Sequence, residues 1–74
     1  MKTLVRDGLS LYIFADATPV LVESDKITVG DPVEFIIGDC NSGNTILYEG
    51  VTEPADWAVG QFLFDGSVWT PVTP

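Results

Sequence analysis

Short runs of β-branched and aromatic residues dominate this chain, and within most of them apolar and polar positions alternate. A period of two residues is typical of strands on a pleated sheet. The dipeptides Asp7-Gly8, Ser24-Asp25 and Asp65-Gly66 separate neighbouring runs and suit tight hairpin turns. The pattern predicts about six to eight short antiparallel strands, at residues 3–6, 9–14, 20–23, 26–29, 33–37, 45–49, 61–64 and 67–70.

The predicted fold class is all-β, a small barrel or roll of the size of SH3-, Sm- or OB-like domains, with residues 1–74 as a single domain. Ser10, Tyr12 and Phe14 are expected to share one face of their strand. Residues 33–37 are apolar almost throughout, which predicts a strand buried on both faces. Residues 52–57 have helical chemistry for one turn only.

The small size of the chain limits its core. A chain of 74 residues buries only about 60% of its unfolded surface, so its stability as a monomer is marginal. One cysteine and no histidine exclude an internal disulfide and the usual zinc sites. Self-association is the remaining common source of stability, and we expect a homo-oligomer.

The charge of the chain restricts its partners. Eleven acidic residues against three basic ones give a formal net charge of −8, and the bases Lys2, Arg6 and Lys26 all lie in the first 26 residues. We therefore expect no nucleic-acid partner and no membrane partner, although Sm- and OB-like barrels often bind nucleic acid. The apolar start is interrupted at residues 6–8, so we expect no signal peptide and a reducing cytosol.

The residue types of common catalytic sites are missing. Without histidine, neither a Ser-His-Asp triad nor a Cys-His dyad can form, and no cation follows residue 26 to activate Cys40, which we expect to be partly buried. Most acids stand at turns, where they accept turn hydrogen bonds rather than form a hydrolase pair. We expect no enzyme and no cofactor.

The polar loop at residues 38–44 offers oxygen atoms to a cation. Asp39, Asn41 and Asn44 resemble ligands of a calcium loop, but Gly43 stands where the EF-hand needs an oxygen and Asn44 where it needs glycine. Two readings stay open: a looser cation site, or Asx turns stabilised by the side chains of the loop itself.

Large aromatic residues gather in the second half of the chain. Phe62 and Phe64 alternate with Leu63, so one face of the last predicted hairpin carries rings that a small monomer is expected to leave uncovered. The interface candidates are Phe62, Phe64, Trp69 and Trp57. A core role and a stacking platform for sugars are the alternatives.

The segments MKTLV, LSLYIF, ITVGDP, FIIGDCN and FDGSVW together resemble small proteins of marine tailed bacteriophages, notably phages of cyanobacteria. This group has no established activity. The resemblance implies a role in particle assembly or decoration, in the host cytoplasm and then in the virion, with other phage structural proteins as partners.

The sequence therefore predicts a non-enzymatic structural or interaction protein that assembles with copies of itself. The alternative is a small binding module that takes a sugar, peptide or cation through loop 38–44 and exposed aromatic residues. A third hypothesis is an acidic regulator that imitates nucleic acid.

Overall fold

The computed structural model describes residues 1–72, which form eight strands joined by turns and contain no helix. Every strand pair is antiparallel, which confirms the predicted all-β fold. Each strand lies within two residues of its predicted ends. The strands are β1 (Lys2–Arg6), β2 (Leu9–Phe14), β3 (Val20–Val22), β4 (Ile27–Val29), β5 (Phe35–Ile37), β6 (Thr45–Tyr48), β7 (Phe62–Phe64) and β8 (Trp69–Pro71).

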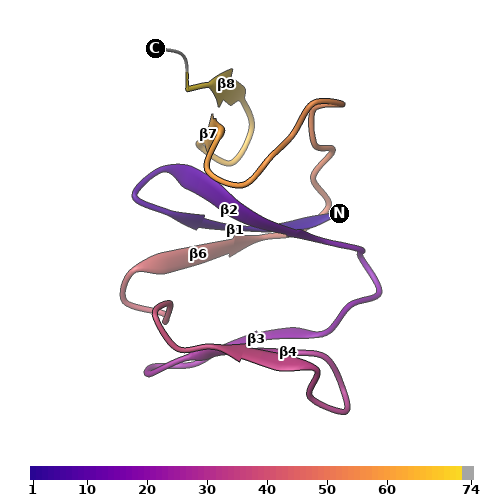
Figure 1. The fold of residues 1–74 in the computed structure, drawn as a ribbon, viewed down its shortest axis with the longest axis vertical. Helices are drawn as coiled ribbons and strands as arrows, with labels where there is room; N and C mark the ends of the chain where they lie inside the picture. Colours follow the sequence, from indigo (N-terminus) through magenta and orange to yellow (C-terminus); the bar gives the residue numbers. More distant parts are fainter. Residues whose placement is uncertain (73–74) are drawn as a thin grey trace.

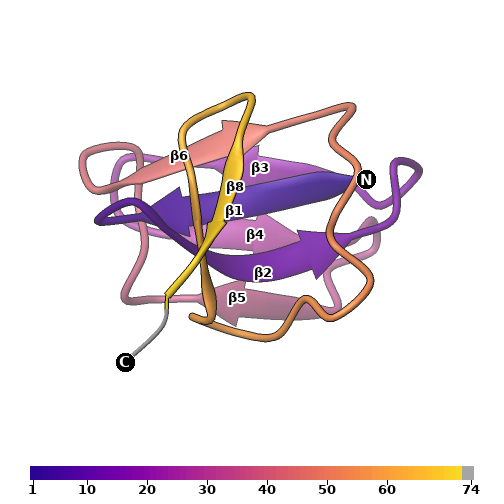
Figure 2. The same ribbon diagram turned by 90° about the horizontal axis from the view of Figure 1, so that it is seen from above.

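The strands form two separate sheets, with the orders β6-β1-β2-β7-β8 and β3-β4-β5. Only one residue pair, Leu9 with Leu63, joins β2 to β7. The larger sheet therefore curls like half a barrel, and the β7–β8 hairpin folds over one of its faces. Figure 1 shows the hairpin, the β6-β1-β2 layer and the small sheet one above another, and in Figure 2 the hairpin crosses over β1 and β2.

The first core lies between the β6-β1-β2 layer and the small sheet. Leu4 of β1 meets Ile27 and Val29 of β4, and all three side chains are fully buried or nearly so. Cys40 completes this cluster and is more deeply buried than expected. Partly buried residues close the rim of the core: Tyr12, Phe14, Val20, Val22 and Leu47.

A second core lies on the opposite face of the β6-β1-β2 layer, beneath the β7–β8 hairpin. The ring of Phe64 meets Tyr48 edge-on with 5.1 Å between centroids and stacks on Trp69 at 4.2 Å. Phe62 meets Trp69 edge-on at 6.4 Å. Such pairs stabilise by about 0.5–1.5 kcal/mol beyond their buried area.

A β-bulge in β2 determines which side chains enter the second core. Leu4 pairs with Tyr12 while Val5 pairs with Ser10, so Leu11 is the extra residue. Ser10 therefore points away from the face that carries Tyr12, and the prediction that they share a face is wrong.

The turned Ser10 side chain links two layers through a chain of hydrogen bonds. Trp57 Nε1 donates to Ser10 Oγ at 2.9 Å, and Ser10 Oγ lies 2.6 Å from Thr3 Oγ1. Thr3 Oγ1 donates to the Tyr12 carbonyl at 2.8 Å, so the hydroxyl of Ser10 donates to Thr3. Trp57 is placed by the single predicted turn, in which its amide donates to the Pro54 carbonyl at 3.1 Å.

Of two predicted two-residue hairpin turns, the first is confirmed and the second is not. Asp7 and Gly8, with φ of 54° and 81°, form the expected two-residue turn. The β7–β8 loop is longer, because Phe64 pairs with Trp69 and residues 65–68 lie between them. The prediction of a two-residue turn at that hairpin is wrong.

Strand β5 is an edge strand. Ile37 is buried against the first core, whereas Phe35 and Ile36 are exposed. The prediction that this strand is buried on both faces is wrong, because no layer among residues 1–72 covers the outer side of the small sheet.

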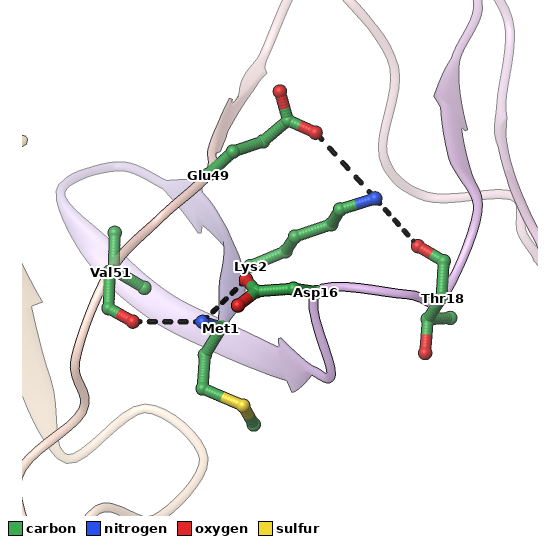
Figure 3. Close-up of polar contacts among 6 residues, drawn as sticks. All are labelled: Met1, Lys2, Asp16, Thr18, Glu49 and Val51. Atoms are coloured by element: carbon green, nitrogen blue, oxygen red, sulfur yellow. Dashed lines mark hydrogen bonds and ion pairs between the residues drawn. The ribbon is translucent and has the colours of Figure 1, made fainter.

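The start of β1 is tied to two neighbouring connections (Figure 3). The Met1 ammonium pairs with Asp16 at 2.6 Å. Lys2 Nζ donates to the Thr18 carbonyl at 2.7 Å and lies 3.5 Å from a Glu49 carboxylate oxygen. The β2–β3 connection and the end of β6 are therefore held at the same end of β1.

Replacing Ser10 with alanine tests the hydrogen-bond chain. Both Ser10 and Thr3 are 0% exposed, so Ser10→Ala leaves the Trp57 indole N–H without its acceptor and Thr3 without its donor. We expect urea unfolding, followed by tryptophan fluorescence, to show a loss of about 1–3 kcal/mol. The exposed Ser24 is the matched control, and Ser24→Ala should change stability by less than about 0.5 kcal/mol. Equal effects of the two variants would contradict this role.

Candidate interaction surface

The structure places the predicted aromatic interface mostly inside the chain. Phe62 and Phe64 alternate with Leu63 as expected, but they face inward and are only 6% and 5% exposed. Trp69 and Trp57 are partly buried, and each contacts a residue of the second core. A single chain therefore covers the two Phe rings without a partner.

Loop 38–44 uses its side-chain oxygens on its own backbone. Asn41 Oδ1 accepts a hydrogen bond from the Gly43 amide at 2.8 Å. Asn44 Oδ1 accepts from the Asn41 amide at 2.9 Å and from Thr45 Oγ1 at 2.7 Å. The hydrogen bond from the Gly43 amide to the Asn41 side chain forms an Asx turn. Within residues 1–72, no three His, Cys, Asp or Glu side chains gather closely enough to hold a metal ion.

The outer side of the small sheet exposes apolar side chains. Leu21 of β3, Thr28 of β4 and Ile36 of β5 are paired in register and form a row across the sheet. We call these three residues the outer sheet face. Leu21 is 59% exposed and Ile36 54%. Single exposed apolar residues are normal, but Leu21 and Ile36 lie in one row on an open sheet, which makes this face the candidate interaction surface.

The edge beside this face extends the apolar surface. Phe35 and Val33 are both exposed, and β5 has no second neighbour in the described part of the chain. The Phe35 ring reaches Phe14 with 6.0 Å between centroids, which holds one side of it against the molecule.

All three basic residues are engaged within the chain. Arg6 donates to the Asp39 carbonyl at 3.2 Å, and Lys2 is held by Thr18 and Glu49 as described above. Lys26 lies 3.7 Å from Glu23 and 3.4 Å from Asp25. The remaining charged side chains are all acidic.

The exposed part of Trp69 borders a groove of about 270 Å³. Glu49, Thr52 and Ser67 also line this groove, so an aromatic ring, a carboxylate and two hydroxyl groups meet in it. This is the place where the structure brings together the groups that the sugar-binding alternative needs.

Comparison of the chain with protein-family models, curated proteins and solved structures finds no match. None of the elements in residues 1–72 is a helix long and apolar enough to cross a membrane.

Sequence reasoning missed Leu21 and Ile36 as surface residues. The signal was present, because residues 20–22 and 35–37 are apolar at consecutive positions and so place apolar side chains on both faces of a strand. A chain this short lacks the residues to cover all of those faces.

Asp65 fixes the loop beside Trp69. Its carboxylate accepts hydrogen bonds from the Val68 amide at 2.8 Å and the Ser67 amide at 2.9 Å. These bonds favour the charged form, so they hold the pKa of Asp65 below its usual value of 3.8.

The lowered pKa of Asp65 makes the loop acid-sensitive. Because the folded pKa lies below the unfolded one, the stabilisation is complete above pH 3.8 and is lost as the pH falls through the folded pKa. NMR titration should show the Asp65 carboxyl changing below pH 3.8, together with the Ser67 and Val68 amides. Asp65→Asn should remove this pH dependence. A transition at or above pH 3.8 would contradict the assignment.

Proposed function

We propose that this protein is a non-enzymatic interaction protein that associates with copies of itself through the outer sheet face. One observation carries the proposal: Leu21 and Ile36 are more than half exposed, in register on either side of Thr28, on a sheet whose opposite side forms the first core.

Two copies can cover this face by stacking their small sheets about a two-fold axis. Packed sheets lie about 10 Å apart, and branched side chains from the two faces interdigitate. In a two-fold contact each residue is buried once in each copy. Complete burial of a fully exposed Leu or Ile side chain stabilises by about 1.5–3 kcal/mol, and because Leu21 and Ile36 are 59% and 54% exposed, each gains roughly half of that. Such a contact supplies the stability that a small monomeric core lacks.

The charge of the protein sets how this association responds to salt. Each copy carries a formal charge of −8, so two copies repel at long range. The row Leu21-Thr28-Ile36 contains no charged side chain of its own. The Glu23 carboxylate accepts a hydrogen bond from Thr28 Oγ1 at 2.8 Å and lies 3.7 Å from Lys26 Nζ, so the acid beside the row is paired with a base. Added salt screens the repulsion and leaves apolar burial in place, so we expect association to strengthen as salt rises.

The biological setting proposed for this assembly is a phage particle, in its formation or decoration. Its support is the resemblance to small marine-phage proteins described above. The proposal includes the host cytoplasm as the place of assembly, the virion as the destination, and other phage structural proteins as partners. The engagement of all three bases inside the chain supports partners other than nucleic acid.

Light scattering over a range of concentrations tests self-association. We expect a defined oligomer that grows in population as salt rises, and Ile36→Asp should shift the mass to that of the monomer because it buries an unpaired charge. The control is Val59→Asp, which adds the same charge at a residue that is 64% exposed in a loop. Circular dichroism verifies that both variants fold.

Three outcomes would oppose the proposal. A wild-type monomer at every concentration, or equal loss of association in both variants, contradicts association through this face. A constant mass combined with a change in tryptophan fluorescence on adding glycans would favour the sugar-binding alternative.

A further inference from the structure

A groove of about 300 Å³ lies on the outward side of the β7–β8 hairpin, away from the second core. Leu63 and Val68 provide its apolar part and are 40% and 57% exposed. The hairpin and the small sheet lie at opposite ends of the molecule (Figure 1). This groove is therefore separate from the outer sheet face. Its lining residues are Gly8, Leu63, Phe64, Asp65, Val68 and Thr70.

Two exposed acidic residues stand near one end of the groove: Asp65 lines it, and Asp7 directly precedes the lining residue Gly8. The Phe64 amide donates to the Gly8 carbonyl at 2.9 Å, which brings the neighbours of these residues, Asp65 and Asp7, to the same end. Within residues 1–72 neither acid forms an ion pair. Hydrogen bonds from loop amides, that of Val68 above all, lower the pKa of Asp65, so its charge persists at neutral pH.

An apolar floor that ends beside two acidic residues without an ion pair fits a long basic side chain. The alkyl stem of a Lys or Arg can lie along Leu63 and Val68 while its charged group reaches the acids. A second copy of this chain cannot readily supply that group, because Lys2, Arg6 and Lys26 are all engaged in contacts of their own.

From this complementarity we infer that the groove docks an extended segment of a different protein, in which a Lys or Arg side chain stands beside an apolar one. The segment lies across the outward face of the hairpin. Pro71 has no backbone N–H, which weakens the edge of β8 as a site for strand addition. Recognition therefore depends on side chains, with the charge supplying selectivity against acidic or neutral segments.

A charge-removing double variant tests the two acids without disturbing their turns. Asn tolerates the left-handed conformation of Asp7, at φ 54°, and its side-chain oxygen can still accept the loop amides that Asp65 binds. The probe is a short synthetic peptide that alternates valine and arginine, added to the isotope-labelled full chain and followed by NMR. We expect shifts centred on the groove amides, and binding about fivefold weaker in the Asp7→Asn/Asp65→Asn protein.

The control variant is Glu34→Gln/Asp56→Asn, which removes the same two charges from exposed positions outside the groove. It should change binding less than twofold, as a remote effect of net charge. A peptide that alternates valine and glutamate should not bind. Equal weakening in the two double variants, shifts centred on the outer sheet face, or no binding of the arginine peptide would overturn the inference.

The two surfaces are distinguishable in the same samples. Rising salt should weaken peptide binding, whereas it should strengthen self-association. At a salt concentration that screens the change in net charge, the Asp7→Asn/Asp65→Asn protein should keep the oligomeric mass of the wild type, and a changed mass there would contradict the independence of this groove.

Discussion

Strand β1 supports both halves of the molecule, because its centre is buried on both faces. Leu4 enters the first core, while Thr3 and Val5 face the second. A chain of this length cannot form one thick core, and two thin cores hold only if the strand between them keeps its polar groups bonded. Ser10 meets this requirement for Thr3 and also accepts the indole N–H of Trp57, so one hydroxyl joins the covering segment to the central layer.

The positions of the strands follow from local sequence, because hairpin turns and alternation act over a few residues. Asp7-Gly8 determines its own backbone conformation and the register of the strands beside it. The bulge at Leu11 is different. A six-residue alternating run gives no sign of this bulge. Whether a strand contains an extra residue depends on which side chains the layers on its two faces can bury. With the bulge at Leu11, Ser10 faces Trp57 and accepts a hydrogen bond from its indole N–H.

Coverage of each face could not be predicted from the sequence for the same reason. Burial of a large ring is especially favourable, and Phe62 and Phe64 on the inner face of the hairpin are covered by the second core. The small sheet then has no further chain to pack on its outer side, and Leu21 and Ile36 remain exposed there. Apolar strands predict that some face will be buried, but which face is left open depends on how the layers pack against one another in the folded chain.

The outer sheet face and the groove on the β7–β8 hairpin differ in their charged surroundings. The three bases stabilise the chain internally, so outside contacts meet a surface of one sign. In the proposed self-association, identical copies repel at long range, and the exposed Leu21 and Ile36 side chains of the outer sheet face supply the apolar burial that offsets this repulsion. The proposed basic partner would be attracted to the whole molecule and would gain close contact where the apolar floor of the groove meets Asp65. Because salt weakens both the repulsion and the attraction, it shifts the balance from the second contact towards the first. The two surfaces lie at opposite ends of the fold, so under the two proposals a copy and a basic partner would not compete for the same site, and ionic strength would set the balance between them.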